Sequence, residues 1–144
     1  MINTKLTRKA MIIAYEAHKN QVDKSGVPYI YHPIHVAEQM NTENECIIAL
    51  LHDVVEDTNV TFKQLEEVFS KEIIDILKLL TREENIEYDE YIKRIKNNSI
   101  ACKVKIADLT HNLDKTRLDF VTEVDVKRNE KYKKALYRHR KMRW

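Results

Sequence analysis

The sequence predicts an all-α protein that forms a single compact helical domain. It contains one glycine and two prolines, and all three fall within eight residues, at Gly26, Pro28 and Pro33. Glycine and proline are the residues that most strongly interrupt helices, so the rest of the chain can form helices joined by short turns. With 144 residues, of which 43% are hydrophobic and 33% charged, the chain has the length and composition of one globular domain.

Apolar residues that recur at helical spacing predict the individual elements. They indicate helices at residues 4–20, 33–41, 44–57, 61–69, 71–80, 87–97, 99–115 and 123–138. Pro33 suits the first turn of the second helix, and Thr61 with Gln64 predicts a capping box at the start of the fourth. The run Asn-Asn-Ser at 97–99 indicates the break before the seventh helix.

The composition excludes several classes of protein. A chain with a single glycine has no glycine-rich phosphate loop, which excludes P-loop and dinucleotide-binding folds. No stretch is apolar for long enough to span a membrane, and the N-terminus lacks the features of a signal peptide. We therefore expect a cytoplasmic protein with no membrane partner. Cys46 and Cys102 lie in apolar helical surroundings without zinc-type spacing and are expected to be buried, reduced thiols.

The charge is uneven along the chain, although the net formal charge is only +2. Nine lysines and arginines and one acid lie between Lys127 and Arg143, which leaves 16 basic and 22 acidic residues elsewhere. A basic C-terminal helix can contact nucleic acid or an anion. A solvated helix face explains the same pattern, and a nucleic-acid partner is not expected.

The third predicted helix combines apolar and ionisable residues, in the order ECIIALLHDVVEDT. Its apolar residues indicate burial on most sides, yet it carries His52, Asp53, Glu56 and Asp57. On a continuous helix, His52 stands over Glu56, and Asp53 stands over Glu56 and Asp57. Buried acids are costly unless something compensates them, and a divalent cation would do so. The alternative is that the acids lie on an exposed face.

Two further residues extend this pattern. His32 lies in the Pro28–Pro33 segment, where the proline that follows restricts its backbone. Asp108 lies on the seventh predicted helix, with His111 and Asn112 three and four residues later. Taken singly, His32 is typical of a structural hydrogen-bonding histidine and Asp108 of a surface acid. Together with His52 and Asp53 they provide two nitrogen and two carboxylate donors, a set that suits Mn, Fe, Co or Zn better than calcium.

Three segments of the chain resemble a known family in their order and spacing. They read AHKNQVDKSGVPYIYHPIHVA, ALLHDVVEDT and KIADLTHNL. They are similar to the hydrolase domain of RelA/SpoT-type proteins and to the stand-alone small alarmone hydrolases, over roughly residues 5–120. The resemblance implies one HD-type hydrolase domain over residues 1–144, with a basic C-terminal helix at about 123–144. It also implies a metal-dependent enzyme that removes pyrophosphate from the 3′ position of (p)ppGpp, a small-molecule nucleotide.

The resemblance also implies a role for particular residues. It makes His32, His52, Asp53 and Asp108 the ligands of one divalent ion, Mn²⁺ in the family, with Fe, Co or Zn as alternatives. Glu56 and Asp57 match the acidic pair that positions and activates water, and Lys24, Ser25 and Asn112 match substrate-binding residues. Two positions depart from the family pattern, because Asp23 and Asp114 stand where arginine is usual. The synthetase and regulatory regions of long RelA/SpoT proteins are not expected in a chain of this length.

The two departures keep other functions open. Each places a negative charge where the family presents a positive one to an anionic nucleotide. The alternatives are a phosphohydrolase for a different nucleotide or a phosphorylated dinucleotide, and a non-catalytic domain that binds a metal and a nucleotide.

Overall fold

The computed structural model describes residues 1–113 and 123–143, with side chains up to residue 137, so Asp114 lies outside it. Within these residues the all-helical prediction is confirmed, and the extended structure is limited to one β-bridge between Val22 and Pro28. The helices are α1 (Lys5–His18), α2 (Tyr31–Glu38), α3 (Glu43–Leu51), α4 (Val54–Asp57), α5 (Phe62–Glu66), α6 (Lys71–Leu80), α7 (Tyr88–Ile95), α8 (Ser99–Asn112) and α9 (Glu123–Arg143).

Short polar side chains define where most of these helices begin. Thr4, Thr42, Thr61, Ser70 and Asn98 each accept a hydrogen bond from a backbone N–H in the first turn of the helix that follows. The predicted capping box at Thr61 is confirmed. The Gln64 N–H donates to Thr61 Oγ1 (3.3 Å), and the Thr61 N–H donates to Gln64 Oε1 (2.9 Å).

The prediction of one continuous helix over residues 44–57 is wrong. Helical structure stops at Leu51 and resumes at Val54, so His52 and Asp53 lie in a turn between α3 and α4. The His52 Nδ1–H donates to the carbonyl oxygen of Ala49 (2.6 Å). In a continuous helix that carbonyl would accept from the N–H of Asp53, so the imidazole competes with the helical bond at this point.

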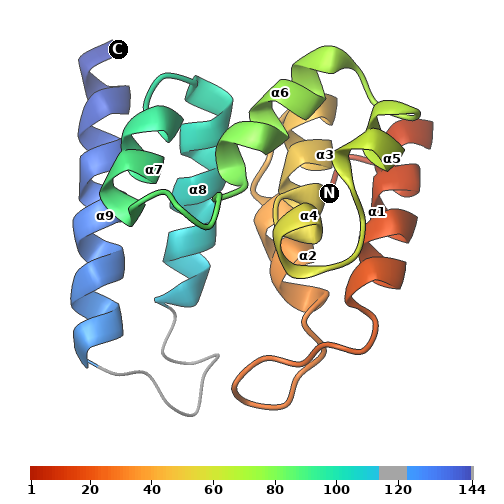
Figure 1. The fold of residues 1–144 in the computed structure, drawn as a ribbon, viewed down its shortest axis with the longest axis horizontal. Helices are drawn as coiled ribbons and strands as arrows, with labels where there is room; N and C mark the ends of the chain where they lie inside the picture. Colours follow the sequence, from red (N-terminus) through yellow and green to blue (C-terminus); the bar gives the residue numbers. More distant parts are fainter. Residues whose placement is uncertain (114–122, 144) are drawn as a thin grey trace.

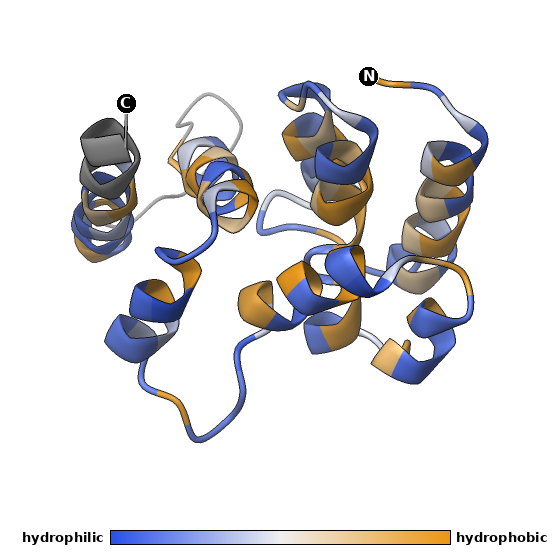
Figure 2. Ribbon diagram, turned by 90° about the horizontal axis from the view of Figure 1, so that it is seen from above, coloured by the Kyte–Doolittle hydropathy of each residue, from blue (hydrophilic) through white to orange (hydrophobic). Residues whose placement is uncertain are grey.

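Helix α3 forms the centre of the core. All six residues from Cys46 to Leu51 are buried, and α3 contacts α1, α2, α6 and α8. In Figure 1, α1 stands at one end of the molecule and α9 at the other, with α9 beside α7 and α8. Figure 2 shows individual helices with apolar residues on one side and polar residues on the other. Both cysteines are buried thiols, as expected.

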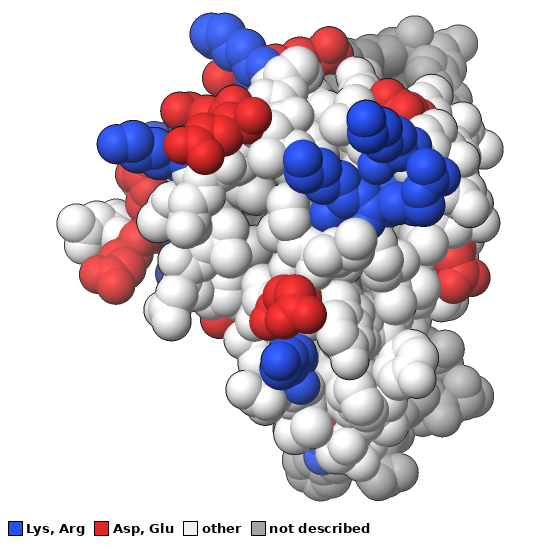
Figure 3. Space-filling model, turned by 90° about the vertical axis from the view of Figure 1, so that its right-hand side faces the viewer, with Lys and Arg blue, Asp and Glu red and all other residues white. Residues whose placement is uncertain are grey.

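The surface carries charges of both signs. Figure 3 views the molecule from the α1 side, where several basic side chains gather in one patch, while other basic side chains and groups of acidic ones lie apart from it. Of the helices in the described part of the chain, none combines the length and hydrophobicity needed to cross a lipid bilayer.

Candidate metal centre

The structure brings together His32, His52, Asp53 and Asp108, which we term the His/Asp cluster. His32 comes from α2, His52 and Asp53 from the turn between α3 and α4, and Asp108 from α8. Each offers one ligand atom, and these atoms all lie within 4.8 Å of one another. His32 Nε2 is 2.7 Å from Asp108 Oδ1, and His52 Nε2 is 3.1 Å from Asp53 Oδ2. The cluster thus offers two imidazoles and two carboxylates to one point.

The surroundings of His52 fit a cation at that point. Its Nδ1–H donates to the backbone, which directs Nε2 toward the two carboxylates. Nε2 is buried and lacks an aligned hydrogen-bond partner. Burial alone would lower the pKa of His52, but the negative charges of Asp53 and Asp108 raise it well above its usual value. A mixed nitrogen and carboxylate donor set, with the Nε2 of a buried imidazole facing two carboxylates, suggests divalent-metal binding.

A tight loop precedes His32, the histidine at the start of α2. Gly26 has φ +81°, a conformation that glycine adopts without strain. Asp23 Oδ1 accepts from the N–H groups of Ser25 (2.8 Å) and Val27 (3.1 Å). The Asp23 side chain, which departs from the family pattern, therefore shapes the loop, and its negative charge is partly offset by backbone dipoles.

Two polar neighbours of the His/Asp cluster were not predicted from the sequence. The Tyr29 hydroxyl donates to Asp53 Oδ2 (2.5 Å), and the pKa of Tyr29 is raised by burial and by the charge of Asp53. Lys105 Nζ lies 2.9 Å from Asp108 Oδ2 and close to the rings of Tyr88 and Tyr91. The only signals for them are positional, since Tyr29 and Lys105 each come three residues before a predicted ligand.

The ammonium of Lys105 and the carboxylate of Asp108 stabilise each other's charged forms. Burial alone would raise the pKa of Asp108, but Lys105 and the imidazoles of His32 and His52 hold it well below its usual range. Burial would likewise lower the pKa of Lys105, but the charge of Asp108 raises it well above the usual value. Asp108 thus presents Oδ2 to Lys105 and Oδ1 to the two histidines.

The acidic pair lies on α4, beside the cluster. Glu56 Oε1 accepts from the backbone N–H of Arg82 (2.7 Å), which ties α4 to the segment after α6. The pKa of Asp57 is raised to about 6, because its carboxyl group is partly withdrawn from water and because Asp53 and Glu56 carry negative charge nearby. Since the helix is interrupted before Val54, the expected stacking of His52 over Glu56 on one continuous helix does not apply.

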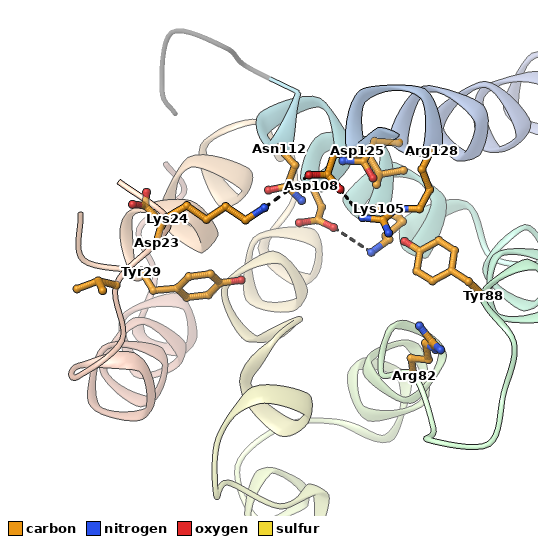
Figure 4. Close-up of a pocket in the computed structure, with 13 residues that line it drawn as sticks. Asp23, Lys24, Tyr29, Arg82, Tyr88, Lys105, Asp108, Asn112, Asp125 and Arg128 are labelled. Atoms are coloured by element: carbon orange, nitrogen blue, oxygen red, sulfur yellow. Dashed lines mark hydrogen bonds and ion pairs between the residues drawn. The ribbon is translucent and has the colours of Figure 1, made fainter. Parts of the chain in front are cut away.

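A cavity of about 580 Å³ opens beside the cluster, and Asp108 belongs to its wall. Four cationic side chains line it, namely Lys24, Arg82, Lys105 and Arg128. Figure 4 shows Lys24 and Tyr29 reaching in from the loop, opposite Lys105, Arg128 and Tyr88. Asn112 lies on the wall as well. Among the described residues, Ser25, Glu56 and Asp57 are not part of this lining.

These features define a class of protein: an all-helical domain in which two histidines and two aspartates could hold a divalent metal ion, beside a cavity lined by cationic and acidic side chains. Comparison with known proteins agrees with this, because the HD domain family matches residues 10–137. The chain belongs to the HD-domain family.

Individual relatives narrow the comparison. The Danio rerio guanosine-3′,5′-bis(diphosphate) 3′-pyrophosphohydrolase MESH1 is 35% identical over 124 residues, which cover 77% of this chain and 69% of that protein. The Escherichia coli K12 bifunctional (p)ppGpp synthase/hydrolase SpoT is 31% identical over 124 residues, which cover 76% of this chain. The chain spans 18% of the length of SpoT.

A solved structure shares the fold. It is described as a metazoan ortholog of SpoT that hydrolyzes ppGpp and plays a role in starvation responses. It aligns with a TM-score of 0.76 at 22% sequence identity and covers 96% of this chain and 87% of that one. The HD-type helical fold predicted from the sequence is thereby confirmed.

Proposed function

We propose that this chain is a metal-dependent phosphohydrolase that removes pyrophosphate from the 3′ position of (p)ppGpp. The observation that carries the proposal is the convergence of the His/Asp cluster, one member of which, Asp108, lies on the wall of a cavity that four cationic side chains also line. The names of MESH1 and other relatives, which are 3′-pyrophosphohydrolases of guanosine-3′,5′-bis(diphosphate), support the choice of substrate.

In this proposal the cluster holds one divalent ion, Mn²⁺ in the first instance, through His32, His52, Asp53 and Asp108. When bound, the ion supplies charge neutralisation at the phosphoryl group and activation of a water molecule. The Tyr29 hydroxyl donates to Asp53, and Lys105 neutralises part of the charge of Asp108.

Glu56 and Asp57 orient the attacking water molecule and accept its proton. Asp57 is the better candidate for accepting the proton of the water, because its partial withdrawal from water raises its pKa and makes it a stronger base than an ordinary aspartate. Glu56 is anchored through Oε1 to the Arg82 backbone, which leaves Oε2 to orient the water. Positioning and charge stabilisation provide most of the rate in phosphoryl chemistry.

The substrate's phosphates would lie in the cavity. Lys24 supplies a point charge from the loop, and Asn112 can donate from the end of α8 to a ribose hydroxyl or a phosphate. Ser25 contributes through the shape of the loop, because its N–H bonds to Asp23.

A second candidate is a phosphohydrolase for another nucleotide or a phosphorylated dinucleotide. Asp23 and Asp125 on the cavity wall favour it, because each places a carboxylate among the cations. Asp125 pairs with Lys24 (3.6 Å) and Arg128 (3.3 Å), so it reduces the positive charge available to a highly charged substrate.

The test is a nucleotide panel read by chromatography and by the release of phosphate or pyrophosphate. With Mn²⁺ the protein should release pyrophosphate from ppGpp, and chelation should abolish this. Asp53→Ala should lose the metal, whereas Glu56→Gln should keep it and lose turnover. Glu66→Gln, an exposed change on α5, is the control that should remain active.

Three outcomes would contradict the proposal. Faster turnover of another nucleotide would favour the second candidate. Tight nucleotide binding without turnover would indicate a non-catalytic domain. Wild-type turnover by the E56Q protein would remove Glu56 from the reaction.

A further inference from the structure

His111 makes a close contact with the cluster that none of the roles above explains. It lies on α8, one turn after Asp108, and its side chain is buried. Its Nδ1 is 2.7 Å from Nδ1 of His32, and the two rings are nearly parallel. The ring of His35 stacks against His111 with centroids 4.0 Å apart.

The distance between the two Nδ1 atoms requires one shared hydrogen. Two lone pairs at 2.7 Å would repel, and two N–H groups would clash, so one nitrogen donates and the other accepts. The opposite nitrogen of His32, Nε2, is the atom that faces Asp108 and the rest of the cluster. When Nε2 donates its lone pair to a metal, the hydrogen of the neutral ring resides on Nδ1. His111 Nδ1 then has to be the acceptor.

We propose that His111 is a positioning residue that accepts a hydrogen bond from the Nδ1–H of His32 and so fixes the tautomer and ring orientation of that ligand. The inference rests on the proposed metal function. Outer hydrogen-bond partners of this kind typically change metal affinity by about 10- to 100-fold when they are removed. The carbonyl of Ala49 does the same for His52, so each imidazole of the cluster has its Nδ1 held by a partner.

Two substitutions with side chains of similar size and shape separate hydrogen bonding from packing. In asparagine, Oδ1 is attached to Cγ as Nδ1 is in histidine, whereas leucine places a methyl group there. His111→Leu should therefore weaken Co²⁺ binding by about 10- to 100-fold, and His111→Asn should restore affinity close to that of the wild type. His35→Leu, which removes only the stacked exposed ring, is the control and should leave affinity unchanged.

The measurement is Co²⁺ affinity by competition with a chromophoric chelator, with the visible spectrum of bound Co²⁺ as a second readout of ligand geometry. Thermal unfolding in chelator checks that each variant folds, and H111A replaces H111L if the latter does not. Equal Co²⁺ affinity of the wild-type and H111L proteins would overturn the role of His111 but not the metal site. An equal loss of affinity in H111L and H111N would do the same. Failure of the wild type to bind Co²⁺, Mn²⁺ or Zn²⁺ would instead overturn the proposed metal site.

Discussion

Replacing Lys105 by methionine tests whether Lys105 and a metal ion neutralise the negative charge of the same carboxylate, that of Asp108. Lys105 Nζ is 2.9 Å from Asp108 Oδ2, and the two side chains are 12% and 7% exposed. Opposite unit charges at that distance attract by about 6 kcal/mol at an effective dielectric constant of ~20. Desolvation offsets part of this attraction, and removing one partner of a buried pair typically costs about 3 to 5 kcal/mol. We expect Lys105→Met to destabilise the metal-free protein by that amount.

Bound metal should reduce the loss of stability that Lys105→Met causes. A divalent ion held by Asp108 supplies positive charge to the carboxylate that Lys105 no longer neutralises, so the loss at saturating Mn²⁺ should be less than half of the loss in chelator. By linkage, the K105M protein should then bind metal at least about tenfold more tightly than the wild type, since 1.4 kcal/mol is a factor of ten.

The assay is denaturant unfolding of wild-type and variant proteins, each with chelator and with saturating Mn²⁺. Lys103→Met is the matched control, because Lys103 lies on the same helix and pairs with Glu45 (2.6 Å) instead of the cluster. Its cost should be the same with and without metal. Equal costs in the two conditions for K105M would refute the reasoning.

Two further changes probe the same site. Asp57→Asn removes a carboxyl whose pKa is raised from 3.8 to about 6 by partial burial and neighbouring charges. Ionisation of Asp57 therefore destabilises the folded wild type as pH rises through this range. At pH 7.5 the free energy of unfolding of the metal-free variant should exceed that of the wild type by about 1 kcal/mol, after allowance for solvent screening. Unfolding curves at pH 4 should show no such gain in stability. A gain that is the same at both pH values would show that the ionisation of Asp57 is not its cause. Tyr29→Phe removes the hydroxyl that donates to Asp53 Oδ2 (2.5 Å) and should lower the free energy of unfolding in chelator by about 1.5 to 3 kcal/mol. Unchanged unfolding curves would show that this bond contributes nothing.

The sequence predicts the helical fold and the convergence of the cluster for different reasons. The fold follows from local rules, since helix breakers are confined to residues 26–33 and caps such as Thr61 stand at the helix starts. Nothing local brings Asp108 to His32, which lies 76 residues earlier. That expectation came from the pattern of donor types and from the resemblance, and the geometry is consistent with it.

What escaped prediction depends on which faces of separate helices meet. Tyr29, Lys105 and His111 each lie three residues from a member of the cluster, yet many residues at that spacing face solvent. The packing of α8 against α2, α3 and α6 decides that Lys105 and His111 face the site. The sequence does not predict the interruption of the helix at His52, because the apolar pattern continues through it. That pattern does not reveal that the His52 side chain donates to the backbone carbonyl of Ala49.

The interruption between α3 and α4 accounts for two neighbouring residues that face the same point, with His52 Nε2 3.1 Å from Asp53 Oδ2. Adjacent side chains on a regular helix diverge by about 100° around its axis. Asp53, with φ −104° and ψ −2°, departs from that geometry at the position that follows His52. In the proposed metal site, the His-Asp dipeptide can therefore offer both side chains to one ion only while the helix stays open there. A substitution that let the helix close should separate the two side chains without changing either residue.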